Sequence, residues 1–258
     1  MCTGLPEPFG PRFPGVDSEK RSSLPLMLHA GAEPVEYGAL RELEVPPDTT
    51  TYAPIPHFRV VDLVAHALGY CGHQVTEQHF GVTPDGARFF GVLCLRSEYT
   101  DYTDTVGLRN SHDKRFPVGI SFGSKVFVCD NLAFSGDHVI KRKHTGNLKR
   151  DLPGLIGEIV EPLAIQREAH KSCIDCYHAT DVTELATDHA IMEMYRRDVI
   201  AAQAIAHIHN EWQTPSHEWG GKTGWRLFNA ATHALSGTVI ENPRSTAALH
   251  EIIDQVCA

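Results

Sequence analysis

The hydrophobic pattern of this chain changes its period once, near residue 145. Before that point, short apolar runs alternate with turn residues, which is typical of β-strands. After it, Leu148, Leu152, Leu155 and Ile159 recur at a spacing that only a helix places on one face. Strands followed by helices predict an α+β fold, because a parallel doubly wound sheet would alternate the two.

The clearest local signal in the strand region is a β-hairpin. Val75–Val82 and Arg88–Arg96 flank Thr83-Pro84-Asp85-Gly86, in which proline presets the turn and glycine accepts a positive φ. One helix is predicted before this hairpin, over residues 57–68, with Gly69 as its C-terminal cap.

Further strands are expected to extend the hairpin into an antiparallel meander of about five strands over residues 73–130. Thr105–Asn110 is predicted as the third strand. Residues 118–122 and 125–129 are predicted as a second hairpin, because they flank Gly123-Ser124, a residue order favoured by a type II′ loop.

The domain boundaries follow from composition and periodicity. Residues 1–55 are rich in proline and glycine and are predicted to form an extended N-terminal arm, which either packs partly on the body or is a flexible tail. Residues 56–240 are predicted to form a single α+β domain with its helical part over 145–235, and residues 241–258 a short C-terminal helix. The helical part contains periodic segments at about 148–163, 187–212 and 223–235.

Composition excludes several classes of protein. The chain has 258 residues, and its apolar runs are far shorter than the about 20 residues that cross a bilayer, so no membrane partner is expected. The N-terminus lacks the organisation of a secretory signal, and the seven cysteines are scattered, so we expect a cytoplasmic protein with reduced thiols. The net charge of −9 disfavours a surface that attracts nucleic acid everywhere, but a local basic patch could still bind phosphate.

Such a patch is present, since five formal positive charges fall within ten residues of an otherwise acidic chain. A shorter basic run lies between the predicted third and fourth strands, where it could extend the same surface. Aromatic residues nearby, Tyr99, Tyr102 and Phe116, could add stacking for single strands, although aromatics in a meander are more often core. The predicted nucleic-acid-binding residues are Arg109, Lys114, Arg115, Lys141, Arg142, Lys143, Lys149 and Arg150. The alternative is a solvated helix entrance.

Two other polar clusters contain residue types that are common at functional sites. Arg109-Asn110-Ser111-His112-Asp113 is either a ligand-binding loop or a turn held by side-chain bonds, and its adjacent Ser, His and Asp cannot form a catalytic relay. His170, Cys173, Cys176 and His178 have zinc-ligand chemistry, but a second half-site is missing. The default there is free cysteines on a helix, so no metal or other cofactor is predicted.

Four motifs follow one another along the chain: Arg109-Asn110-Ser111-His112-Asp113, Cys129-Asp130-Asn131, Lys143-His144-Thr145-Gly146-Asn147 and Trp225-Arg226-Leu227-Phe228-Asn229-Ala230-Ala231-Thr232. Their order resembles that of a phage/plasmid-like protein family of unknown function, domain-of-unknown-function family 932. The resemblance spans about residues 55–240, implies a mobile-element protein and transfers no catalytic residue.

A second set of motifs lies in residues 59–110, where a helix ends in Gly69-Tyr70-Cys71-Gly72 and a strand contains Phe90-Gly91-Val92. This region is similar to the N-terminal half of the eukaryotic single-strand annealing recombinases, which implies an oligomeric ring that binds single-stranded DNA.

These observations predict a homo-oligomeric, non-enzymatic protein of a phage or plasmid that binds single-stranded DNA and anneals strands in recombination. Two alternatives stay open. One is a metal-dependent enzyme that acts on nucleotides or nucleic acid through His170, Cys173, Cys176 or His178. The other is a protein-binding effector that inhibits a host system through its acidic surface.

Overall fold

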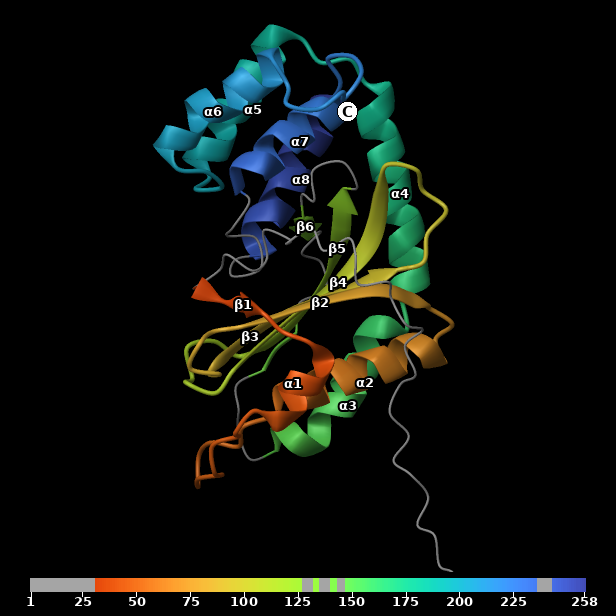
Figure 1. The fold of residues 1–258 in the computed structure, drawn as a ribbon. Helices are drawn as coiled ribbons and strands as arrows, with labels where there is room; N and C mark the ends of the chain where they lie inside the picture. The colour runs from red at the N-terminus through yellow and green to blue at the C-terminus, as the bar shows by residue number, and fades with distance from the viewer. Residues whose placement is uncertain (1–30, 127–131, 135–139, 143–146, 236–242) are drawn as a thin grey trace, which may run out of the picture.

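The computed structural model describes residues 31–126, 132–134, 140–142, 147–235 and 243–258. Their fold is α+β, as the sequence predicts: an antiparallel sheet lies between two groups of helices (Figure 1). The helices drawn below the sheet in Figure 1 pack on one of its faces, and the C-terminal helices drawn above it pack on the other. This arrangement gives three layers and two hydrophobic cores.

Neighbouring strands of the sheet pair in the order β1-β2-β3-β4-β5-β6, and β7 also pairs with β5. The predicted hairpin is confirmed, because β2 and β3 flank residues 83–87 and Gly86 has a φ of 69°. The strands are β1 (Glu33–Pro34), β2 (Val75–Val82), β3 (Arg88–Leu95), β4 (Tyr102–Ser111), β5 (Val118–Val126), β6 (Leu132–Phe134) and β7 (Ile140–Arg142).

The predicted hairpin around Gly123-Ser124 is wrong, because both residues lie inside the single strand β5. Gly123 pairs with Thr105 on β4 and with Phe134 on β6, and Ser124 is paired on both sides as well. A turn here would break both ladders, so pairing with the long β4 outweighs the local preference of the Gly-Ser pair. Residues 127–129 of that predicted hairpin lie outside the described residues.

The lower layer contains α1 (Tyr37–Glu42), α2 (His57–Tyr70) and α3 (Leu148–Val160), which cover one sheet face (Figure 1). Val60 and Val64 of α2 pack there with Leu152 of α3 against the sheet. Ile55 and Leu40, from the segment assigned by composition to an N-terminal arm, are buried in the same core, whereas residues 1–30 lie outside the described residues.

The upper layer is formed by the C-terminal helices, and the segment 187–212, expected to be one periodic unit, is divided between two of them. The first of these helices, α5, ends just before Asp198, which has a left-handed backbone with a φ of 55°. The amide of Val199 then donates to Met194 O at 2.9 Å, which is typical of a helix C-terminus. Within the described residues, no helix is long and apolar enough to cross a membrane. The helices are α4 (Leu163–Ala179), α5 (Glu184–Arg196), α6 (Ala202–Gln213), α7 (Gly224–Leu235) and α8 (Pro243–Cys257).

Candidate nucleic-acid interface

One end of the sheet brings two of the predicted basic segments into the same row. Strand β5 lies between β4 and β7, and Gly119 of β5 pairs with Arg109 on one side and with Lys141 on the other. Arg142 pairs with Val118, the first residue of β5. Residues directly opposite each other in antiparallel ladders occupy one row across the sheet, so the backbones of Arg109 and Lys141 lie at matching register positions on either side of Gly119.

Arg109 lies flat across this row. A Cβ placed on Gly119 would lie 2.7 Å from Arg109 Nε, so the arginine side chain occupies the space that a larger residue would fill. Its guanidinium carbon is 5.3 Å from the centre of the Phe116 ring, within cation–π range. The arginine therefore extends from β4 over β5, held above an aromatic ring that is itself half-buried.

The turn between β4 and β5 carries two more predicted residues, Lys114 and Arg115, both exposed. Asp113 shapes the turn: its Oδ1 accepts from the amide of Arg115 at 3.0 Å and its Oδ2 from Arg88 Nε at 2.7 Å. Lys114 has a φ of 64°, and its Nζ lies 4.6 Å from the centre of the Tyr52 ring. Within the part of the chain that the structure describes, neither Lys114 nor Arg115 forms an ion pair.

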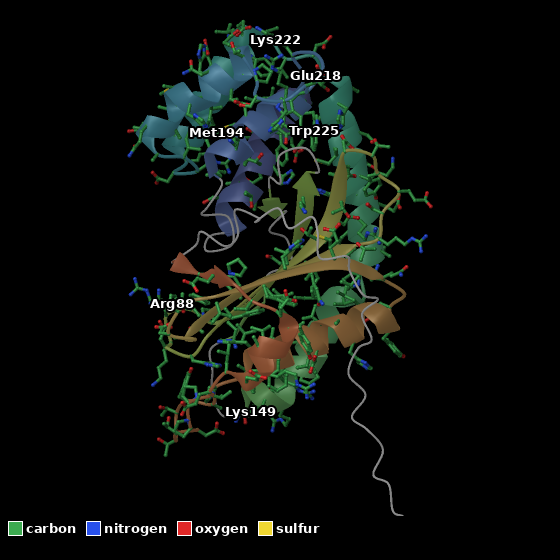
Figure 2. All side chains as sticks on the ribbon, in the orientation of Figure 1. Arg88, Lys149, Met194, Glu218, Lys222 and Trp225 are labelled. Carbon is green, nitrogen blue, oxygen red and sulfur yellow. The ribbon has the colours of Figure 1, made fainter. Side chains whose placement is uncertain are left out.

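The third basic segment begins α3, which contacts β7. Figure 2 labels Lys149 on this helix, below the sheet, and Arg88 at the end of the sheet. Both predicted residues of the segment are exposed but paired: Lys149 Nζ lies 2.6 Å from Asp48, and Arg150 Nε lies 2.8 Å from Asp151. Exposed pairs of this kind are weak and exchange readily, so these cations remain available to a phosphate.

Three of the predicted binding residues, Lys141, Arg142 and Lys143, are described only by their backbone or lie outside the described residues. Lys141 and Arg142 are located by their backbone in β7, and Lys143 lies outside the described residues. Of the aromatic residues, Tyr102 is buried and stacks on Tyr99 at 4.5 Å between ring centres, so it belongs to the core.

The run from Arg109 to Asp113 is not a loop over most of its length, because β4 continues to Ser111. Asn110 is fully buried and its Nδ2 donates to Ile55 O at 2.8 Å, while His112 Nε2 lies 2.9 Å from the same carbonyl. Ser111 Oγ donates to Phe116 O at 2.8 Å and closes the turn. These contacts support the structural alternative for the run and leave Arg109 as its member at the candidate interface.

The four residues of the possible zinc motif point to different partners. His170 is buried, with its ring 5.7 Å from Phe122, and Cys173 Sγ lies 3.2 Å from Asp254. Cys176 faces Thr180, and His178 Nε2 lies 2.7 Å from Asp101 Oδ2. The helix α4 therefore spreads these side chains around its circumference.

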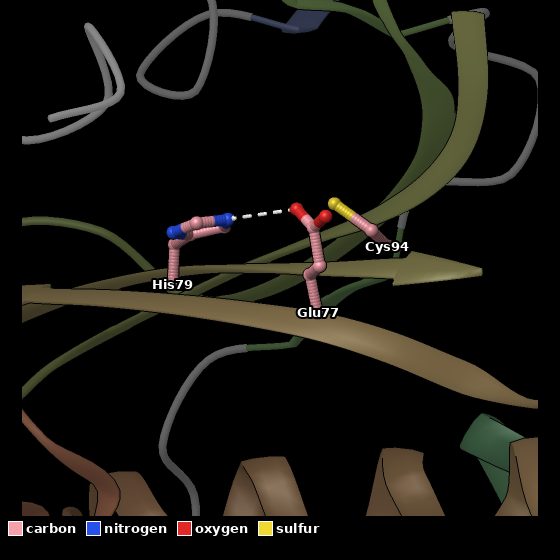
Figure 3. Close-up of side chains that lie close together, drawn as sticks. All are labelled: Glu77, His79 and Cys94. Atoms are coloured by element: carbon pink, nitrogen blue, oxygen red, sulfur yellow. Dashed lines mark hydrogen bonds and ion pairs between the residues drawn. The ribbon is translucent and has the colours of Figure 1, made fainter. Parts of the chain in front are cut away.

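A different set of ligand-type side chains, which the sequence reasoning missed, gathers on the sheet (Figure 3). Glu77 and His79 alternate along β2, and Cys94 lies directly opposite Glu77 on β3. The predicted hairpin brings these two strands together, but the sequence does not fix their register. Val82 pairs with Phe89, so Glu77 faces Cys94, whereas a pair between Val82 and Arg88 would place Glu77 opposite Leu93.

Comparison of the chain with family models, with curated proteins and with solved structures gives no match. The resemblances based on motifs therefore stay predictions.

Proposed function

We propose that this protein binds nucleic acid, with single-stranded DNA as the favoured form, at one end of its sheet. This end, called the basic end below, carries Arg109, Lys114, Arg115, Lys141 and Arg142. The observation that carries the proposal is the row Arg109–Gly119–Lys141, which joins basic segments that are distant in the sequence. Phosphate contacts need positive charge and donors but little exact geometry, and this end offers both on several neighbouring elements.

The preference for a single strand comes from the similarity of residues 59–110 to the single-strand annealing recombinases. Arg109 adds positive charge rather than a stacking surface, because it is buried over the half-buried Phe116 ring, with 8% of the residue exposed. The exposed Lys114 and Arg115 extend from the adjacent turn, where they can follow a strand of phosphates.

The proposal extends, through the motif resemblances, to a homo-oligomer of a phage or plasmid that anneals complementary strands. Its direct tests are an annealing assay with complementary oligonucleotides and the mass of the protein with and without DNA. A stable complex with a host protein, together with an absence of DNA binding, would instead favour the effector alternative.

The primary experiment is fluorescence anisotropy with labelled single- and double-stranded oligonucleotides over a salt series. Wild-type protein is expected to bind the single strand more tightly, with an affinity that falls steeply as salt rises, because counterions are released from phosphate. Reversing both charges in Lys114→Glu/Arg115→Glu should weaken binding and lower the salt slope by about 1.4, since each lost single-strand contact removes about 0.7.

The matched control is Lys171→Glu/Arg196→Glu, which makes the same change of charge on α4 and α5, away from the basic end. Both control residues form surface ion pairs, so their reversal alters overall charge without touching the proposed interface. An equal loss of affinity in the two double variants would mean that only net charge matters. That result, or no binding by the wild type at low salt, would overturn the proposal.

A further inference from the structure

We propose that Glu77, His79 and Cys94 form a binding site for a divalent zinc-type metal ion on the sheet, with one coordination position open to water or a ligand. The site is separate from the proposed interface for nucleic acid and goes beyond that function. It combines a carboxylate, an imidazole and a thiol, the three ligand types that zinc accepts in proteins.

The backbone of the hairpin brings the three side chains together. Glu77 and His79 are two residues apart on β2, so both project from the same face of the sheet. Cys94 is the direct cross-strand partner of Glu77, and therefore projects from that face as well. The three ligands thus come from two strands of one hairpin, a scaffold that positions side chains more firmly than a loop does.

The distances are close to those of a metal site. One ligand atom from each residue lies within 4.8 Å of each of the others, and His79 Nε2 is 3.4 Å from Glu77 Oε2. Zinc–ligand bonds of about 2.0–2.3 Å in a tetrahedron separate the ligand atoms by about 3.3–3.8 Å. The ligand atoms therefore need to move closer together by less than about 1.5 Å, which side-chain rotation can supply. Figure 3 shows the carboxylate of Glu77 between the imidazole of His79 and the thiol of Cys94.

The burial of the ligands indicates a site that opens on one side. Cys94 is only 1% exposed, whereas the His79 side chain is 24% exposed and that of Glu77 is 51% exposed. The thiol therefore forms the floor and the carboxylate the rim. Three protein ligands leave the fourth tetrahedral position to water, which is the arrangement of catalytic zinc rather than of structural zinc.

Lys125 is the one charged neighbour that opposes metal binding among the contacts described for Glu77. Its Nζ lies 3.7 Å from Glu77 Oε2, so the ammonium shares the oxygen that faces His79. A bound dication would repel this ammonium, and the metal must compete with it for the carboxylate. Lys125→Met removes the competitor and keeps most of the side-chain volume, so it should tighten metal binding by about threefold to tenfold.

The test uses the full-length protein, freed of metal with a chelator and titrated with Zn²⁺ against a chromophoric indicator. One ion per chain is expected, with affinity lowered at least about tenfold in His79→Ala and in Cys94→Ser. Titration with Co²⁺ should produce a thiolate-to-metal charge-transfer band that Cys94→Ser abolishes. Thermal unfolding of each variant without metal checks that the fold is kept, and Glu77→Gln, at the exposed rim, supplies a variant with little risk to folding.

Two controls separate this site from other thiols and imidazoles. Cys173→Ser/Cys176→Ser removes the cysteines of α4, and His66→Ala removes an exposed histidine of α2. Both should bind metal as the wild type does. Adding azide should shift the visible bands of the Co²⁺ form, because the anion enters the open position.

Several outcomes would overturn the inference. Less than one ion bound per chain, or a Co²⁺ charge-transfer band that persists in Cys94→Ser and disappears in Cys173→Ser/Cys176→Ser, would remove the site. A spectrum unchanged by azide would refute the open position. Weaker rather than tighter binding in Lys125→Met would contradict the assigned role of Lys125.

Discussion

The side chain of Arg109 lies against the backbone of Gly119, so that a Cβ at residue 119 would be 2.7 Å from Arg109 Nε and 2.8 Å from its Cγ. The space above this glycine is thus already filled by the arginine. A methyl group at the position forces Arg109 away from Phe116, since the clash includes a carbon near the base of the side chain.

Gly119→Ala should therefore lower the free energy of unfolding by about 1–3 kcal/mol, the usual cost of overpacking, and weaken the proposed DNA binding. Urea denaturation and anisotropy measure the two effects. Gly157→Ala on α3 is the control, because a Cβ there meets nothing within 4 Å and alanine favours the helix by up to about 1 kcal/mol. A Gly119→Ala protein as stable as the wild type would show that Arg109 does not occupy this space.

Asn110 joins the N-terminal segment to the sheet. Its Nδ2 donates to Ile55 O at 2.8 Å and lies 2.9 Å from His57 Nδ1, and the side chain is fully buried. Asn110→Ala leaves both acceptors without this donor, so we expect a loss of about 2–3 kcal/mol in the free energy of unfolding. Asn110→Asp should cost more, because it places a carboxylate against the same acceptors. The exposed Asn210→Ala should change stability by less than about 0.5 kcal/mol, and an equal effect of the two alanine variants would contradict the assigned role of Asn110.

The parts of this fold that were predictable depend on neighbours in the sequence. The turn at Thr83-Pro84-Asp85-Gly86 fixes β2 and β3 locally, so its chemistry decides the outcome. Gly123-Ser124 has turn chemistry as well, but its conformation is decided by pairing with β4 and β6, which no local rule contains. Long-range pairing thus accounts for the error.

The same distinction applies to the candidate sites. The basic residues could be selected from their concentration in the sequence, but the row through Arg109 and Lys141 depends on β5 pairing with both β4 and β7. The meeting of Glu77 with Cys94 likewise depends on a register that the turn residues alone do not fix, because Val82 pairs with Phe89 rather than with Arg88, the first residue of β3. Spacing along the chain therefore does not reveal this pair.

Two buried histidines make stability depend on pH. Burial lowers the pKa of His170 to about 4 and, together with the nearby His170, that of His250 to about 3. The folded-state pKa values lie below the unfolded value of 6.5, so the unfolded chain binds more protons in acid. Stability from these groups is complete above about pH 6.5 and is lost as the pH falls towards 4, by about 1.4 kcal/mol per pH unit for each histidine.

Urea denaturation at pH 7, 6 and 5 measures this slope. His170→Leu removes one titrating group from a site lined by the Tyr102 and Phe122 rings, and should flatten the dependence by about 1.4 kcal/mol per pH unit. His209→Leu, an exposed residue of α6, should leave the slope unchanged. An identical slope in the wild type and His170→Leu would contradict a buried neutral imidazole.

Arg167 connects α4 to the sheet through a buried carboxylate. Its Nε donates to Asp104 Oδ2 at 2.6 Å and its Nη2 to Arg96 O at 2.7 Å, while Asp104 is fully buried. Burial raises the pKa of Asp104, although Arg167 opposes that shift by hydrogen bonding and charge. Arg167→Met leaves the carboxylate uncompensated, so we expect a loss of about 3–5 kcal/mol in the free energy of unfolding at pH 7.

The pH dependence of this loss identifies its cause. Without Arg167 the pKa of Asp104 rises further, so the carboxyl group becomes neutral as the pH falls and the difference from the wild type should shrink between pH 7 and pH 5. Asp104→Asn in the Arg167→Met background should recover most of the loss at pH 7, because no buried charge remains. A loss that is the same at both pH values and is not recovered by Asp104→Asn would mean that Arg167 acts only through packing and its bond to Arg96 O.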